Sequence, residues 1–231
     1  MKTHVLCGIL ILIATVLFAQ SEGQILKELQ RRIGPSTGIS ISVQNGAVTL
    51  TGTTSSLAQK LNVINMARRT IGVQSVVDRI TVVPAVKQTD DQITQAVKKA
   101  LAANLSADER KAIIVTARNG VVTLTGTLPS SYPKQVAGVL ASTVPGVVDV
   151  RNEIAVKPTQ PRTDSEILTD VTSRFAKNPI IPASQIAVTV SNGVVTLSGT
   201  VSTFVQAEQA ESIARFVPGV VDVRNLLFVK G

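Results

Sequence analysis

The sequence has very few reactive side chains. Its 231 residues include one cysteine (Cys7), one histidine (His4) and no tryptophan. Both Cys7 and His4 lie among the first 23 residues, so the remainder of the chain has neither type. This excludes, from that remainder, Ser-His-Asp and Cys-His nucleophilic catalysis, disulfides, and zinc sites built from thiolate or imidazole ligands. We therefore expect a protein that is not an enzyme, with no metal and no cofactor.

Aromatic residues are also scarce, at 3% of the chain. Proteins that bind single-stranded nucleic acid usually stack the bases on aromatic side chains, and few are available here. The chain is nevertheless basic, with a net charge of +8, which favours an anionic partner. Since an exported protein rarely meets nucleic acid, we expect an anionic membrane or another envelope surface as partner, and no nucleic acid.

Export is indicated by the first residues. The stretch from Val5 to Ala19 is almost continuously apolar, and Ser21-Glu22-Gly23 places small residues at the minus-three and minus-one positions of a cleavage site. This pattern predicts a signal peptide over residues 1–23 and a location in the periplasm or cell envelope. An uncleaved anchor is the alternative, disfavoured because a membrane span needs about 20 apolar residues.

One short module is repeated along the chain. Asn-Gly followed by a Thr-rich apolar stretch occurs three times, at intervals of 74 and 73 residues. A second block, Gly-Val leading into an apolar run, follows each copy at a nearly constant distance. Such periodicity predicts three tandem units. We place module 1 at residues 24–86, module 2 at 89–158 and module 3 at 163–231.

Each module has the pattern of an α+β fold. In module 1, Ile39, Ile41 and Val43 alternate with polar residues before Asn45-Gly46, which predicts a β-hairpin with one buried face. N-cap hydroxyls after the hairpin predict a helix, and a β-branched run then predicts a third strand. Capping boxes beginning at Thr89 and Thr163 predict a helix before the hairpin. The order is α-β-β-α-β, so we expect a three-stranded sheet covered by two helices in each module.

The recurring turn residues are interpreted as architecture. Asn and Gly supply the positive φ of hairpin tips and helix ends, and this geometry explains them without a ligand. Asp90 and Asp91 are likewise interpreted as stabilising a helix start. The turn residues are Asn45, Gly46, Gly72, Asn119, Gly120, Gly146, Asn192, Gly193 and Gly219.

The modules differ in charge. The net charge is +6 for residues 24–87, +2 for 88–160 and zero for 161–231. Each basic group near an anionic bilayer contributes up to about 1 kcal/mol, so a cluster of them gives salt-sensitive attachment. A solvated, solubilising surface is the alternative. The candidate lipid contacts are Lys27, Arg31, Arg32, Lys60, Arg68 and Arg69.

The second helix of module 1 adds an apolar element. Its core-facing positions are those that are apolar or small in all three copies, which places Leu57, Leu61 and Ile64 on the opposite side of the helix. We assign this aliphatic strip to lipid contact, or alternatively to a face covered by another helix or module. The equivalent face of module 3 is a candidate surface for a partner protein: Phe204, Glu208, Glu211 and Arg215.

These repeats resemble the BON domain, a bacterial module found in OsmY-like periplasmic proteins. The resemblance rests on Asn-Gly-Val-Val-Thr-Leu-Thr-Gly-Thr, a helix, and Pro-Gly-Val-Val-Asp-Val-Arg-Asn before an apolar strand, and it covers residues 24–231 in three copies. Module 1 departs from it with Ile71-Gly72 in place of Pro-Gly and with a shorter loop before its hairpin. The resemblance implies a non-enzymatic envelope protein that interacts with phospholipid surfaces, in envelope maintenance or osmotic stress.

Two other functions remain open at this stage. Some relatives bind partner proteins or assist the folding of exported proteins, and others bind small ligands. A protein-interaction or chaperone-like module is therefore the first alternative, and weak binding of a small ligand or potassium is the second.

Overall fold

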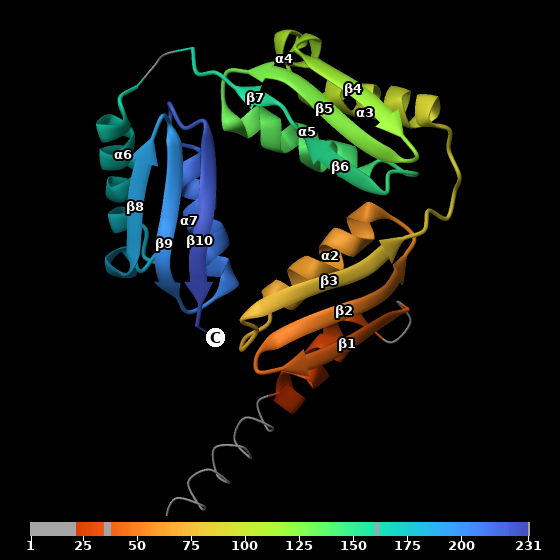
Figure 1. The fold of residues 1–231 in the computed structure, drawn as a ribbon, viewed down its shortest axis with the longest axis horizontal. Helices are drawn as coiled ribbons and strands as arrows, with labels where there is room; N and C mark the ends of the chain where they lie inside the picture. The colour runs from red at the N-terminus through yellow and green to blue at the C-terminus, as the bar shows by residue number, and fades with distance from the viewer. Residues whose placement is uncertain (1–21, 35–37, 160–161, 231) are drawn as a thin grey trace, which may run out of the picture.

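The computed structural model describes residues 22–34, 38–159 and 162–230. The predicted signal peptide, with His4 and Cys7, lies almost wholly outside the described residues. The described chain forms three modules of the same α-β-β-α-β plan (Figure 1). The α+β fold class expected from the sequence is confirmed.

The helices and strands follow one another in the same order in each module. Module 1 contains a helix over residues 22–33, β1 (Ile39–Gln44), β2 (Ala47–Thr54), α2 (Leu57–Arg68) and β3 (Ser75–Val82). Module 2 contains α3 (Asp90–Asn104), α4 (Ala107–Lys111), β4 (Ile113–Arg118), β5 (Val121–Leu128), α5 (Ser131–Thr143), β6 (Asp149–Asn152) and β7 (Ala155–Val156). Module 3 contains α6 (Asp164–Lys177), the 3₁₀ turn η2 (Ala183–Gln185), β8 (Ile186–Ser191), β9 (Val194–Val201), α7 (Phe204–Arg215) and β10 (Asp222–Val229).

The sheets are mixed, with the second hairpin strand in the centre. In module 1, β1 pairs antiparallel with β2, and β3 pairs parallel with β2 on its other edge. The parallel pairing requires a crossover, and α2 provides it. Modules 2 and 3 repeat this order, with the third strand of module 2 divided into β6 and β7.

The hairpin tips have the predicted geometry. Asn45 and Gly46 have φ values of 49° and 74°, and the two equivalent turns lie within a few degrees of them. Both residues of a type I′ turn require positive φ, which Asn and Gly tolerate best. The Asn-Gly pairs are therefore turn architecture, as expected.

Helix starts follow the capping signals with one exception. The capping boxes at Thr89 and Thr163 are formed, and Ser56 and Thr203 accept hydrogen bonds at the starts of α2 and α7. Ser130 occupies the N-cap position of α5 but accepts no such bond. The third helical residue there is Pro133, which has no N–H to donate.

Aspartate side chains in the first turn of a helix also hold the hairpin tips, in addition to the role expected for them at the helix start. The carboxylate of Asp90, at the start of α3, accepts from the backbone N–H groups of Asn119 and Gly120 at 2.8 and 2.9 Å. Asp164 holds the tip of module 3 in the same way. The first helix is thereby tied to the hairpin of its own module.

Each module has its own aliphatic core. The positions of the second helix that were predicted to face the core are buried or half-buried; for example, Ala67, Ala141 and Ala214 are fully buried. These alanines let α2, α5 and α7 approach their sheets closely.

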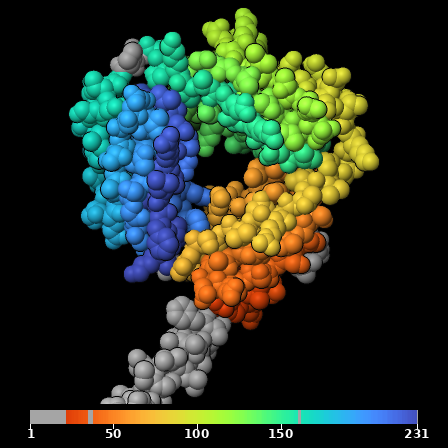
Figure 2. All heavy atoms as spheres, in the orientation of Figure 1, coloured from red at the N-terminus to blue at the C-terminus, as the bar shows by residue number. Residues whose placement is uncertain are grey.

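The three modules are arranged in a ring. Helices α2, α5 and α7 lie on the sides of their modules that face the centre (Figure 1), and the space-filling view shows an opening there (Figure 2). The linkers after β3 and β7 join module 1 to module 2 and module 2 to module 3. Modules 1 and 3 also meet, with no linker between them, and close the ring.

Candidate functional site

The first residue of each second helix lies at a junction between modules. Leu57 packs into the hydrophobic cluster of module 2, although it belongs to α2 of module 1. The hydroxyl of Ser131 in module 2 donates to the carbonyl of Arg215 in module 3 at 2.7 Å. Phe204 of module 3 packs against the core cluster of module 1. The helix face opposite the core, which the sequence offered for lipid or partners, is therefore the face that assembles the ring.

This arrangement corrects part of the lipid assignment. Leu57 and Ile64 are 6% and 8% exposed, so neither is available to a membrane surface. Leu57 is covered by module 2, and Ile64 belongs to the buried cluster of module 1. Leu61 alone of the aliphatic strip remains accessible, at 39%. The covered alternative applies to Leu57, whereas Ile64 lies in the core of its own module and not on the opposite side of the helix as predicted.

The candidate partner surface of module 3 faces module 1 and the centre of the ring. Arg69 of α2 forms an ion pair with Glu208 at 3.2 Å. Glu211 pairs with Arg215 within α7 at 2.7 Å. Phe204 and Glu208 thus contact module 1 of the same chain, whereas Glu211 and Arg215 pair with each other within α7.

Lys60 is also engaged within its module. Its ammonium group lies 2.8 Å from Asp78 on β3 and donates to the carbonyl of Ile80 at 2.7 Å. Strand pairing shows that Asp78 is equivalent to Asn152 and Asn225, whose amides donate to carbonyls of α5 and α7. Lys60 therefore joins α2 to β3 and does not belong to the accessible basic surface.

The basic residues of helix 22–33 lie next to the end of α2. Arg32 donates to the backbone carbonyl of Arg69 at 3.3 Å and to the hydroxyl of Thr70 at 3.0 Å. Arg31 is paired with Glu28, and their hydrogen bond holds the pKa of Glu28 below its usual value and raises the pKa of Arg31. Arg32 thus joins helix 22–33 to the end of α2, and the cations of residues 27–32 and 68–69 lie on these two elements. We call this part of module 1 the corner.

Two cations at this corner have no bound partner. Lys27 and Arg68 are exposed, and neither forms a hydrogen bond or ion pair with any residue that the structure describes. Unpaired, solvated cations keep their full charge available to an anionic surface. They are the strongest candidates for electrostatic attachment.

Ile71 also lies at this corner, beside Arg32 and Arg69. It is not one of the predicted lipid contacts. It is 87% exposed in the turn between α2 and β3, where modules 2 and 3 have Pro145 and Pro218. A shallow cavity of about 460 Å³ lies beside it, between helix 22–33 and the turn. The sequence shows that module 1 has Ile71-Gly72 in place of Pro-Gly, but it does not show which residues surround Ile71. We call the set Lys27, Arg31, Arg32, Arg68, Arg69 and Ile71 the corner patch.

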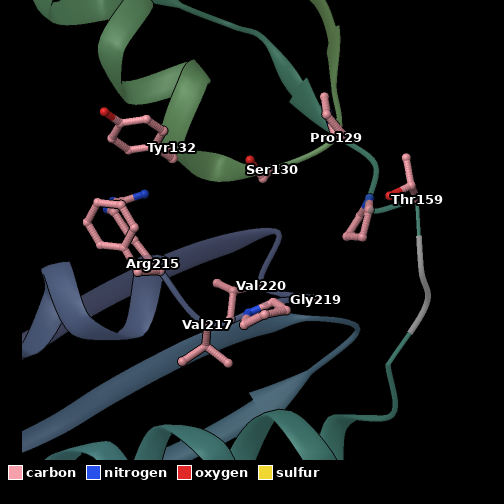
Figure 3. A pocket seen from close by; sticks show the side chains of 11 residues that line it. Pro129, Ser130, Tyr132, Thr159, Arg215, Val217, Gly219 and Val220 are labelled. Carbon is pink, nitrogen blue, oxygen red and sulfur yellow. The ribbon is translucent and has the colours of Figure 1, made fainter.

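A second accessible feature lies between modules 2 and 3. A cleft of about 330 Å³ is formed by the start of α5 and the turn that follows α7 (Figure 3). The rings of Tyr132 and Phe216 contact each other at its edge, with centroids 5.2 Å apart, and both are about half-exposed. Pro129, Pro158 and Pro218 also line it. The cleft is aromatic and apolar, and it offers no unpaired charge, because Arg215 is bound by Glu211 and Asp222.

A polar hollow lies at the centre of the ring. Its volume is about 540 Å³, and all three modules contribute to its lining, with Arg69, Gln135 and Glu208 among the residues. Within the described ranges, no three His, Cys, Asp or Glu side chains are placed to hold a metal ion. None of the helices in residues 22–34, 38–159 and 162–230 is long and apolar enough to cross a bilayer.

Comparison with known proteins finds the same family in each module. The model of the BON domain matches residues 19–84, 89–158 and 163–231. Osmotically-inducible protein Y of Escherichia coli strain K12 is 32% identical over 149 residues, which are 61% of this chain and 73% of that protein. The 21 kDa hemolysin of Actinobacillus pleuropneumoniae is 35% identical over 148 residues, 61% of this chain and 74% of that protein.

A third relative matches a smaller part of the chain, and a solved structure matches most of the chain but shares little of its shape. Outer membrane lipoprotein DolP of Haemophilus influenzae is 38% identical over 109 residues, 46% of this chain and 56% of that protein. The solved structure is the C-terminal domain of CdsD, a structural protein of the type III secretion system of Chlamydia trachomatis. It is 16% identical to this chain, and the match covers 89% of this chain and 96% of the solved CdsD chain. Its TM-score is 0.25, which is too low to indicate a shared arrangement.

Proposed function

The chain belongs to the BON domain family, and on this basis we propose that it is a non-enzymatic envelope protein that binds anionic phospholipid through module 1. The names of two relatives, an osmotically inducible protein and an outer membrane lipoprotein, support a role at the envelope and in osmotic stress or envelope maintenance. The predicted signal peptide agrees with this location.

The corner patch is the observation on which the lipid assignment rests. It combines an isoleucine that is 87% exposed with five cations from two elements, two of them without a bound partner. Anionic headgroups attract the cations, and the aliphatic side chain can enter the interface between headgroups and acyl chains. An isolated exposed isoleucine needs no functional explanation, but its position among arginines favours this one.

Flotation with vesicles tests the proposal. We expect the protein to float with vesicles that contain phosphatidylglycerol and not with pure phosphatidylcholine vesicles. The double variant Lys27→Glu/Arg68→Glu should bind at least about tenfold more weakly, because two cations of about 1 kcal/mol each become repulsive. Binding should also weaken with added salt, since these groups are exposed.

A matched control separates the patch from net charge. Arg118→Glu/Arg151→Glu makes the same change in charge on exposed residues of module 2 that form no side-chain bond with any described residue. This control should bind almost as well as the unaltered protein. Equal weakening in both double variants would show that net charge, and not the corner patch, governs binding; equal binding by all three proteins would refute the assignment.

A protein-interaction or chaperone-like function is the second candidate, and the cleft between modules 2 and 3 favours it. The chain has few aromatic residues, and the rings of Tyr132 and Phe216 are half-exposed at this cleft. Exposed aromatic rings are suited to binding an apolar segment of another protein. Suppression of client aggregation without lipid, and its loss in Tyr132→Ser, would support this function. Unchanged suppression in that variant would exclude the cleft.

A further inference from the structure

The contact between modules 1 and 3 is built differently from the other two junctions. We call it the seam. It consists of the Arg69–Glu208 ion pair, the packing of Phe204 on module 1, and a hydrogen bond of 3.0 Å from the side chain of Gln74 to the carbonyl of Lys230. Among the salt bridges of the described residues, Arg69–Glu208 is the one that joins two modules.

The seam is also the one of the three junctions in the described ring that no linker spans, so modules 1 and 3 can separate by rotation at the other two junctions. Modules 1 and 2, and modules 2 and 3, are connected by the chain, whereas modules 1 and 3 are joined through non-covalent contacts such as these. The side chains of Arg69 and Glu208 are 57% and 34% exposed, and an ion pair so exposed stabilises little and is screened by salt. The ion pair of the seam is therefore easily displaced by a competing anion.

Arg69 belongs to the seam and to the corner patch at once. The guanidinium of Arg69 donates hydrogen bonds to the carboxylate of Glu208 in the closed ring. A lipid phosphate would bind the same guanidinium through similar hydrogen bonds. A cleft of about 90 Å³ lies between residues 68–73 of module 1 and residues 202–205 of module 3, so the patch directly borders the seam.

We propose that module 3 is an intramolecular competitor for the lipid surface of module 1, with Glu208 occupying Arg69 in the closed ring, and that docking on anionic lipid opens the seam. This inference rests on the proposed function. In the open form Arg69 is released to the lipid, and Phe204 and the first turn of α7 lose their cover. Because a ligand shifts an equilibrium only through its different affinity for the two states, removal of Glu208 must strengthen lipid binding.

The test measures lipid binding and local hydrogen exchange together in the full chain. Glu208→Gln removes the carboxylate of the seam and retains the shape of the side chain. It should raise the affinity for phosphatidylglycerol vesicles about two- to fivefold, the range that corresponds to an exposed ion pair. Glu153→Gln is the matched control, because Glu153 is an exposed residue of module 2 whose side chain has no bound partner among the described residues.

Hydrogen exchange locates the change. With vesicles, residues 24–33 and 68–72 should exchange more slowly, and residues 202–208 should exchange faster. Binding with unchanged exchange at residues 202–208, or equal affinities for Glu208→Gln and Glu153→Gln, would overturn this inference and leave the proposed function intact. Absence of binding by all forms would overturn the proposed function and the inference with it.

Discussion

Modules 1 and 3 have the same fold and strand pairing, yet they differ where their surfaces meet solvent or each other. Where module 1 has Asp78 paired with Lys60, module 3 has Asn225, whose amide donates to the carbonyl of Ala207 at 3.1 Å. Where module 3 has Pro218 after its second helix, module 1 has the exposed Ile71.

The comparison separates what the fold requires from what can vary. Both modules keep the positive-φ turn, which the hairpin requires, and a buried alanine in the second helix, which lets helix and sheet approach closely. Charge varies freely outside these positions, and module 1 has most of the net positive charge. The two modules consequently form complementary sides of one junction.

The largest expected effect concerns a glycine of the central strand. Gly199 has φ of 121°, and a Cβ atom there would lie 2.1 Å from the carbonyl oxygen of Gln185, which the turn η2 holds in place. Gly199→Ala should therefore destabilise module 3 by about 2–5 kcal/mol, from backbone strain and overpacking. Urea unfolding combined with hydrogen exchange of residues 186–201 measures the loss.

The equivalent glycine of module 1 provides the comparison. A Cβ at Gly52 would lie 2.2 Å from the carbonyl of Gly38, itself a glycine in a short loop. Because Gly38 can shift more easily than Gln185, Gly52→Ala should cost less than Gly199→Ala. Equal losses would mean that φ alone sets the cost.

The next effect concerns the tie between the second helix and the third strand. Asn225→Asp removes the donor to Ala207 and places a carboxylate beside Glu211, whose oxygen lies 3.1 Å from the amide nitrogen. We expect module 3 to lose about 2–4 kcal/mol at pH 7. Thermal unfolding followed by circular dichroism, with exchange data to assign the module, measures it.

The reverse substitution in module 1 should be much milder. Asp78→Asn keeps the size of the side chain, and Lys60 retains the carbonyl of Ile80. The partly exposed ion pair that it removes is worth about 1 kcal/mol or less. A larger loss than in Asn225→Asp would show that the two ties are not equivalent.

The third prediction replaces Ile71 of module 1 with proline, the residue that module 3 has at the equivalent position 218. Ile71→Pro should leave stability unchanged or raise it by about 0.4–1 kcal/mol, because proline restricts the unfolded chain and the equivalent positions already hold proline. The same variant should bind phosphatidylglycerol vesicles about fivefold more weakly, since one aliphatic anchor is lost. Ile114→Ser, at an exposed isoleucine of module 2, is the control that should bind normally.

The smallest expected effect is an acid sensitivity of module 3. The hydrogen bond from Arg174, and then that from Arg162, holds the pKa of Asp170 below its usual value, although partial burial opposes the shift. A carboxylate with a lowered folded pKa stabilises above its unfolded pKa of about 3.9 and loses that contribution as pH falls. Since the side chain is 27% exposed, the contribution is below about 1 kcal/mol.

Module 2 serves as the internal reference for this effect. Alignment of the two first helices places Ala96 where module 3 has Asp170. Urea midpoints measured from pH 6 to pH 3 should fall more for module 3, and Asp170→Asn should remove the difference. The same pH dependence in that variant would assign the effect to other carboxylates.

Most of the local structure was predictable from sequence because its causes are local. The Asn-Gly turns, the capping boxes at Thr89 and Thr163, and the alternation of the hairpins each depend on residues within a few positions. The cap at Ser130 failed for an equally local reason, the missing N–H of Pro133. The role of Asp90 was missed because its partners lie 29 and 30 residues away.

The functional surface was predictable only in part. The basic residues of module 1 stood out from charge alone, but Lys60 is bound by Asp78, and Leu57 and Ile64 are covered. A helix face that is apolar and opposite its own core has the same sequence pattern whether lipid or another module covers it, so only the positions of the other modules distinguish the two.

The sequence by itself determined the three modules, their strands and helices, the turn residues and the concentration of charge in module 1, because repetition and short-range physical chemistry suffice for each. The tertiary structure decided the parallel pairing of the third strand, the closure of the ring, and which side chains of module 1 remain accessible. These depend on contacts between residues far apart in the chain, such as Arg69 with Glu208, and no local pattern encodes which of two available partners such a side chain meets.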